Sequence, residues 1–140
     1  MAAPAARRYA IDASTLLRIV TGPVPVPDDV QLVAPSGIRS QALGILLSRV
    51  QAGELSDAEA RELHTRMTEL RIRVLGDRVS RWTAFRLARE HGWTTTADAE
   101  YLAVAQLQAD ALVTVDPQLA ARADGVVPVA GLDALGGSGD

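Results

Sequence analysis

The chain contains no cysteine and no lysine among its 140 residues, and only 4% of them are aromatic. The absence of cysteine excludes disulfides, thiolate metal sites and a cysteine nucleophile, so any bound metal must be held by oxygen or imidazole. The absence of lysine excludes P-loop phosphate binding, Schiff-base chemistry and the receiver-domain pocket in which a lysine accompanies aspartates. All 14 basic residues are therefore arginines.

The sequence also lacks a long apolar run and a strong excess of either charge. No stretch approaches the roughly 20 apolar residues that a membrane span needs. Asp12 interrupts the apolar residues that follow Arg7 and Arg8, so we expect no signal peptide and a cytoplasmic protein without a membrane segment. A net charge of −3 argues against nucleic-acid binding by bulk electrostatics alone, although bound divalent ions would offset several carboxylates.

Short apolar runs alternate with helical patterns along the whole chain, and its length fits one domain, residues 1–135, with a flexible tail at 136–140. Strands are predicted at 9–11, 31–34, 72–75, 111–115 and 126–129, and helices at 14–20, 36–51, 56–70, 77–92, 97–107 and 117–123. Right-handed crossovers place such helices on both faces of a parallel sheet. We therefore expect an α/β fold, a three-layer α/β/α sandwich with a mostly parallel central sheet.

Capping residues mark the starts of three predicted helices. Ser36 is expected to cap the helix that ends near Gln51, Ser56 and Glu59 have the spacing of a capping box, and Asp77 caps a further helix. The 36–51 helix carries an apolar stripe of Leu43, Leu46, Leu47 and Val50. The large aromatic side chains are predicted to pack in the core or at an interface: Trp82, Phe85 and Trp93.

Two aspartates follow predicted strands at points where a helix begins. Asp12 follows the 9–11 strand and Asp116 the 111–115 strand, and either could serve only as a helix N-cap. If the two strands are neighbours, about 4.8 Å apart, both carboxylates instead converge at the edge where open α/β sheets bind ligands. Their mutual repulsion then calls for a cation, and hard oxygen ligands suit Mg²⁺ or Mn²⁺.

A third aspartate, Asp98, lies at the start of the 97–107 helix. A capping box with Thr95 is one explanation for it. However, this helix runs directly into the strand that delivers Thr114 and Asp116. In this arrangement the sequence resembles the PIN-domain family, and within it the VapC toxins of bacterial toxin–antitoxin pairs. Residues 9–14 (YAIDAS) resemble the first motif of that family, residues 98–105 (DAEYLAVA) the third, and residues 114–116 (TVD) the fourth.

The resemblance implies metal ligands at Asp12, Asp98 and Asp116, with Ser14 and Thr114 as supporting hydroxyls. Members of the family fold as an α/β/α sandwich and cleave RNA with Mg²⁺ or Mn²⁺. They are silenced by a cognate antitoxin protein and form homodimers. The resemblance therefore implies an RNA substrate, an antitoxin partner and a homodimer for this chain.

The second motif departs from the family pattern, because Gln41 stands where the family usually has a glutamate near the start of the second helix. An amide can offer one oxygen to a metal or to its water, but it carries no charge and cannot act as a base. Glu100 is the acid that could compensate. It lies two residues from Asp98, which on a regular helix directs the two side chains to different faces.

The leading hypothesis is a metal-dependent endoribonuclease, the toxin of a VapBC-like pair, that hydrolyses RNA phosphodiester bonds with metal-activated water. The alternative, favoured by Gln41, is a catalytically weakened or inactive PIN-fold module that binds RNA or a protein partner. A phosphatase is disfavoured because Asp12 has no second acid beside it and lysine is absent. The 36–51 helix and the helix after Ser56 are expected to form the antitoxin groove.

Overall fold

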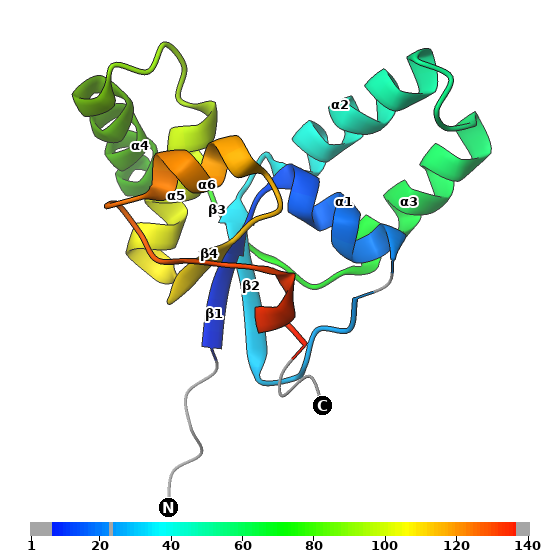
Figure 1. The fold of residues 1–140 in the computed structure, drawn as a ribbon, viewed down its shortest axis with the longest axis horizontal. Helices are drawn as coiled ribbons and strands as arrows, with labels where there is room; N and C mark the ends of the chain where they lie inside the picture. Colours follow the sequence, from blue (N-terminus) through cyan, green and yellow to red (C-terminus); the bar gives the residue numbers. More distant parts are fainter. Residues whose placement is uncertain (1–6, 23, 137–140) are drawn as a thin grey trace, which may run out of the picture.

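A parallel β-sheet forms the centre of the molecule. The computed structural model describes residues 7–22 and 24–136 (Figure 1). Its strands are β1 (Arg7–Ile11), β2 (Val30–Pro35), β3 (Arg73–Leu75), β4 (Ala111–Val113) and β5 (Val129–Ala130). All pair in parallel in the order β3-β2-β1-β4-β5. The predicted α/β class is confirmed.

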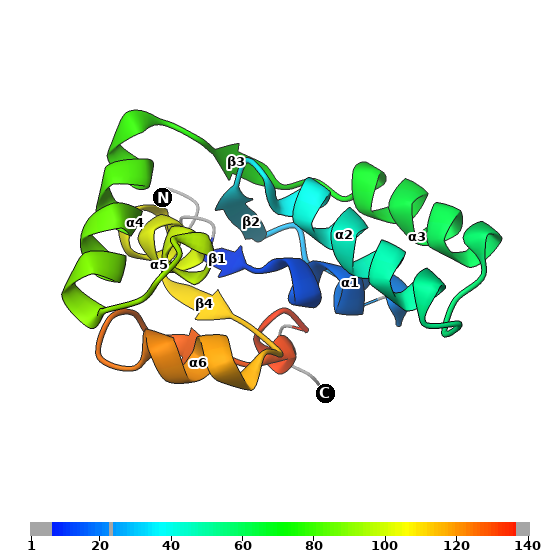
Figure 2. The same ribbon diagram turned by 90° about the horizontal axis from the view of Figure 1, so that it is seen from above.

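Helices cover both faces of this sheet. They are α1 (Ala13–Thr21), α2 (Ile38–Gln51), α3 (Asp57–Glu69), α4 (Arg78–His91), α5 (Ala97–Gln108), α6 (Pro117–Ala123) and the 3₁₀ turn η1 (Leu132–Ala134). Helix α5 packs across β1, β2 and β4 and is covered by α4, whereas α1 packs against α2 and α3 (Figure 2). The three-layer sandwich is therefore confirmed. None of the helices in residues 7–22 and 24–136 is long and apolar enough to cross a membrane.

The sheet is apolar on both sides because helices cover both of its faces. Ile11, Leu32 and Leu112, on three adjacent strands, are at most 1% exposed. Leu102 of α5 is equally buried and lies in the same core. These side chains form one continuous core between the sheet and α5.

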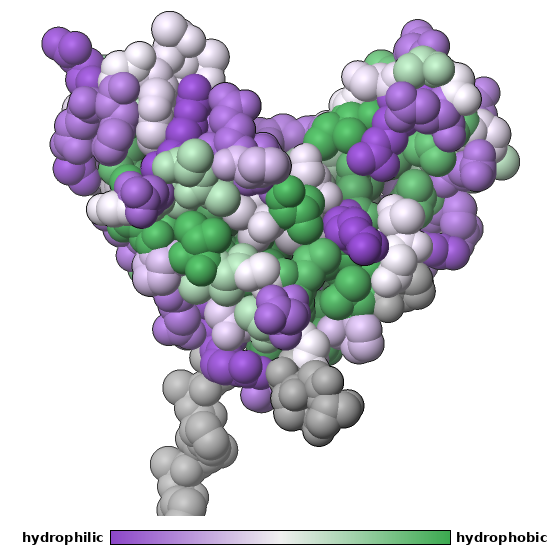
Figure 3. Space-filling view, viewed as in Figure 1, coloured by the Kyte–Doolittle hydropathy of each residue, from purple (hydrophilic) through white to green (hydrophobic). Residues whose placement is uncertain are grey.

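The strand order places a topological switch point between β1 and β4. From β1 the chain builds β2 and β3 on one side and then returns to add β4 and β5 on the other, with Ile11 paired to Val113. Residues that follow β1 and β4 consequently emerge side by side at the carboxyl edge, the usual ligand position in such sheets. Above this edge the surface is hollowed between an arm made of α4, α5 and α6 and an arm made of α2 and α3 (Figure 3).

Two of the three predicted helix caps are present. The Ser56 hydroxyl accepts from the Glu59 amide at 3.0 Å while the Glu59 carboxylate accepts from the Ser56 amide at 2.9 Å, and Asp77 accepts from the Ser80 amide at 2.9 Å. The prediction for Ser36 is wrong. Its amide donates to the Leu75 carbonyl at 2.8 Å, which extends the pairing with β3, so α2 begins one residue beyond Gly37.

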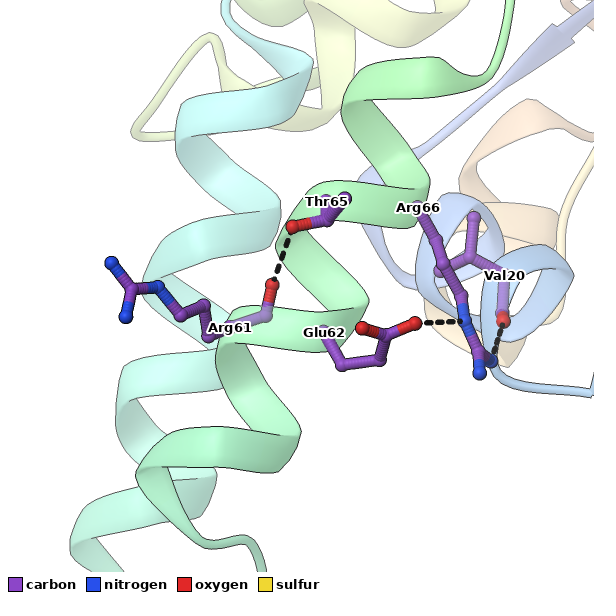
Figure 4. Close-up of polar contacts among 5 residues, drawn as sticks. All are labelled: Val20, Arg61, Glu62, Thr65 and Arg66. Carbon is purple, nitrogen blue, oxygen red and sulfur yellow. Dashed lines mark hydrogen bonds and ion pairs between the residues drawn. The ribbon is translucent and has the colours of Figure 1, made fainter.

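Helix α3 is attached to the end of α1 by an arginine (Figure 4). The Arg66 guanidinium donates to the Glu62 carboxylate at 3.2 Å and to the Val20 carbonyl, at the end of α1, at 3.1 Å. Arg39 of α2 donates to the carbonyls of Met67 and Leu70 at the same, C-terminal end of α3. Arg66 thus ties α3 to α1, and Arg39 ties α2 to α3, each through carbonyls at a helix end.

Helix α4 turns its aromatic residues outward. Its buried face consists of small and aliphatic residues, among them Ala84 and Leu87, whereas Val79, Trp82 and Phe85 are 56%, 58% and 47% exposed. Placement of Trp82 and Phe85 in the core is therefore wrong, because small side chains let α4 approach α5 closely and leave the large ones on the opposite face. Their assignment to an interface stays a prediction.

Several boundaries differ from the predictions. Strand β4 ends at Val113, two residues earlier than expected, and the last strand comprises Val129 and Ala130 instead of 126–129. The expected tail at 136–140 lies outside the described residues except for Gly136. The shorter β4 matters for the site, because residues 114–116 form a connection whose polar groups face the start of α1.

Candidate functional site

Asp12 is the most buried acid of the sheet edge, with only 3% of its surface exposed. It occupies the N-cap position of α1, yet its carboxylate makes no capping hydrogen bond to that helix. Its Oδ1 instead accepts hydrogen bonds from the hydroxyls of Thr15 and Thr114, the latter at 3.1 Å. The interpretation of Asp12 as only an N-cap is therefore wrong.

The two threonine hydroxyls are held in a fixed direction by the backbone. Thr15 Oγ1 accepts from the Val115 amide at 3.1 Å, and Thr114 Oγ1 accepts from the Asp116 amide at 3.0 Å. Because each hydroxyl receives a proton from the backbone, its own proton is directed to Asp12. This network joins the start of α1 to the β4–α6 connection, across the switch point.

Thr114 was predicted as a supporting hydroxyl and has this position. Ser14, the other predicted hydroxyl, makes no side-chain hydrogen bond within the described part of the chain, and Thr15 supports Asp12 in its place. The sequence contained a signal for Thr15. In the first turn of α1, Thr15 is three positions after Asp12 and lies on the same face of the helix, whereas Ser14 is two positions after Asp12 and lies on another face.

Asp116 serves as a helix cap and belongs to the cluster as well. Its Oδ1 accepts from the Gln118 amide at the start of α6 at 2.9 Å, which confirms the capping interpretation. Its charge also acts on Asp12. Burial raises the pKa of Asp12 above 3.8 and the neighbouring charge of Asp116 adds to that rise, outweighing the opposing effect of Thr15 and Thr114.

Asp98 is paired with an arginine that the sequence had not indicated. The Arg122 guanidinium, from α6, lies 3.1 Å from the Asp98 carboxylate, and the two side chains are 30% and 25% exposed. Helix α5 has Thr96 at its N-cap without a side-chain cap bond, so the proposed capping box of Thr95 with Asp98 is absent. Asp98 therefore faces α6.

Gln41 belongs to the same region through Tyr101. The phenol of Tyr101, in the buried face of α5, donates a hydrogen bond to Gln41 Oε1 of α2. Burial raises the pKa of Tyr101, and the charges of Asp12, Glu100 and Asp98 raise it further. The phenol thus stays protonated and remains a donor. Tyr101 lay within the DAEYLAVA motif, but nothing in the spacing indicated its partner.

Glu100 points to a different part of the molecule from Asp98. It lines a small cavity of about 40 Å³ together with Ser36, Ser80 and Arg81, near the ends of β2 and β3. The two-residue separation of Glu100 from Asp98 therefore has the effect expected on a regular helix. Within the described residues Gln41 Oε1 accepts its hydrogen bond from Tyr101 and not from a group hydrogen-bonded to Glu100.

The donor set suits a hard divalent cation, since Asp12, Asp98 and Asp116 supply only carboxylate oxygens. Burial, and to a smaller extent the charge of Asp116, raises the pKa of Asp12, and a bound cation would favour the ionised carboxylate. Even so, among residues 7–22 and 24–136 no three acidic or histidine side chains are gathered closely enough to form a ready metal site.

Comparison with known proteins defines the fold alone. No protein-family model matches the chain, and no curated protein matches it. A solved structure that resembles it is that of PAE2754 from Pyrobaculum aerophilum, with 24% sequence identity and a TM-score of 0.68 over 93% of this chain and 94% of that one. The α/β architecture is therefore shared over nearly the whole length of both chains.

We predict that Asp12→Asn stabilises the protein at neutral pH. A carboxyl whose pKa is raised in the folded state stabilises the fold below its unfolded pKa, and this stability is lost as the pH rises through the folded pKa. Asparagine keeps an acceptor for both threonine hydroxyls without the charge. In urea unfolding with a chelator present, Asp12→Asn should therefore exceed the wild type at pH 7, and the difference should shrink as the pH falls towards about 4.

The control is Asp28→Asn, which removes an exposed carboxylate and should leave the pH dependence unchanged. Equal or lower stability of Asp12→Asn at pH 7 would contradict a raised pKa of Asp12 in the folded protein.

Proposed function

We propose that this chain is a divalent-metal-dependent endoribonuclease and the toxin of a VapBC-like toxin–antitoxin pair. The observation that carries the proposal is the position of Asp12: buried at the switch point, supported by two hydroxyls, and repelled by Asp116. Asp98 and Gln41 extend the same group, in the chain order of the PIN-domain motifs that the sequence resembles. Because carboxylates and a phosphodiester are both negatively charged, this acidic group can bind RNA only with a cation between them.

Asp12, Asp98 and Asp116 would hold Mg²⁺ or Mn²⁺, which when bound would supply the activated water and the positive charge for phosphodiester hydrolysis. The remaining residues have supporting roles. Thr15 and Thr114 keep the Asp12 carboxylate in one orientation. Tyr101 fixes the amide oxygen of Gln41, so that this side chain can orient water or a phosphate oxygen without adding charge.

The second candidate is a PIN-like module that binds RNA or a protein partner without cleaving RNA. Two observations favour it. Gln41 supplies no fourth carboxylate, and Asp98 already has a cationic partner in Arg122. Metal binding separates the two candidates, because only the nuclease requires it.

Exposed apolar side chains support two kinds of protein partner. On α2, Leu43 and Leu47 remain 47% and 60% exposed beside α3, which suits an apolar antitoxin segment. On α4, the rings of Trp82 and Phe85 stack with centroids 4.7 Å apart, next to the exposed Val79, and this surface suits a homodimer contact.

The cytoplasmic location expected from the sequence remains a prediction.

Mn²⁺ titration by calorimetry of the purified, antitoxin-free protein tests the function. The wild type should bind in the micromolar to low-millimolar range, and Asp116→Asn should lose binding while its amide oxygen still caps α6. Single-stranded RNA should then be cleaved by the wild type only when Mg²⁺ or Mn²⁺ is present. Absence of binding up to several millimolar would favour the non-catalytic module.

We expect Gln41→Glu to increase the rate of RNA cleavage several-fold. The carboxylate restores the charge that attracts the cation and still accepts the hydrogen bond from Tyr101. Single-turnover cleavage at fixed Mg²⁺ measures the effect, and Gln106→Glu, an exposed position of α5, controls for the added negative charge. An unchanged or lower rate would mean that the pocket has adapted to the amide.

The homodimer is tested by Trp82→Glu, which places a charge at the centre of the α4 surface. Light scattering coupled to size-exclusion chromatography should give a dimer for the wild type and a monomer for the variant. Leu47→Glu, an equally exposed apolar position on α2, should remain dimeric. A monomeric wild type, or a dimer that is lost in both variants, would contradict a contact through α4.

A further inference from the structure

The ion pair between Arg122 and Asp98 links two helices at the edge of the acidic group. Arg122 lies in the last turn of α6 and Asp98 in the first turn of α5, 24 residues apart, and their charged atoms are 3.1 Å from each other. Both side chains are mostly buried, at 30% and 25% exposure. The pair is therefore better shielded from water than a typical surface salt bridge.

Arg122 is held from a second side by an aromatic ring. Its guanidinium lies over Trp93, 4.9 Å from the ring centroid, and Trp93 itself stacks on His91 at 4.8 Å. The Trp93 amide donates to the Ala88 carbonyl at 2.9 Å, which fixes the ring against the end of α4. A planar guanidinium can stack on a ring and bind a carboxylate at once, which an ammonium group does less well.

This arrangement has a direct effect on Asp98. The charges of Asp12, Glu100 and Asp98 all raise the pKa of the Tyr101 phenol, so Asp98 lies near the same buried group as Asp12. Nevertheless the acids are not gathered into a ready metal site among residues 7–22 and 24–136. The carboxylate of Asp98 is directed to α6, where Arg122 engages Oδ2.

We propose that Arg122 competes with the divalent cation for Asp98, so that the chain's own guanidinium lowers the affinity of its metal site. The inference rests on the proposed function, because it takes the carboxylate group as that site. A cation that draws Asp98 towards Asp12 and Asp116 must break the ion pair and overcome its free energy. Arg122 is thus a positioning residue that sets the concentration of metal at which the site fills.

Calorimetric Mn²⁺ titration of the full chain tests the competition. Arg122→Gln should bind Mn²⁺ about two- to fivefold more tightly than the wild type, the range expected for the loss of one partly exposed ion pair. Arg122→Lys should lie between them, since it keeps the charge but loses stacking on Trp93. Arg61→Gln removes the same charge from the exposed face of α3 and should leave the affinity unchanged. Circular dichroism spectra and thermal unfolding establish that each variant is folded.

Equal or weaker binding by folded Arg122→Gln, with binding intact in the wild type, would overturn the competition and leave the proposed function standing. A gain matched by Arg61→Gln would also overturn it, because the effect would then be one of net charge. Binding in Arg122→Gln but not in the wild type would support it in its strongest form. Absence of binding in every protein would overturn the competition and the metal site together.

Discussion

The burial of the Asp12 carboxylate is the constraint on which the candidate site depends. A charged group removed from water is costly unless polar partners replace the water, and Asp12 has two neutral hydroxyls, from Thr15 and Thr114. Each hydroxyl is in turn fixed by a backbone amide of the β4–α6 connection. Helix α1 and that connection therefore keep their relative position, because a hydroxyl from each donates a hydrogen bond to the same carboxylate.

The three acids of the group are balanced in different ways. Asp116 lies at the N-terminus of α6, where the backbone amides favour negative charge, and Asp98 is paired with Arg122. Asp12, the most buried of the three, has only neutral partners and keeps a raised pKa. The largest uncompensated cost thus falls on the residue at the switch point, which is where a cation would gain most.

Chain topology made much of this arrangement predictable. Because Asp12 and Asp116 follow neighbouring parallel strands, their convergence follows from the strand order alone, and Thr114 follows with them. Helical spacing correctly separated Glu100 from Asp98. Local periodicity placed each aspartate after a strand, but the adjacency of the two strands was only a condition in the sequence analysis, and Thr114 entered through the resemblance to the PIN-domain family.

Contacts between distant helices could not be predicted in the same way. The bond from Tyr101 to Gln41 spans 60 residues, and the Arg122 pair depends on how α6 packs beside α5. Neither leaves a pattern in the sequence, since arginines on short helices and tyrosines on apolar faces are common. The sequence left open whether Trp82 lies in the core or at an interface, for a related reason. Close packing of α4 on α5 selected its small residues for the buried face, although a hydrophobicity pattern favours the large ones.

The amide at Gln41 fits the same electrostatic account. A carboxylate there would accept the bond from Tyr101 equally well, but it would add a negative charge next to a phenol that the charges of Asp12, Glu100 and Asp98 already reach. The amide keeps the hydrogen bond and adds no charge. In the proposed metal site, Gln41 and Arg122 would therefore act in the same direction: Gln41 would supply no negative charge to the cation, and Arg122 would pair with a charge that is there. Such a site would favour stability of the metal-free protein over tight metal binding.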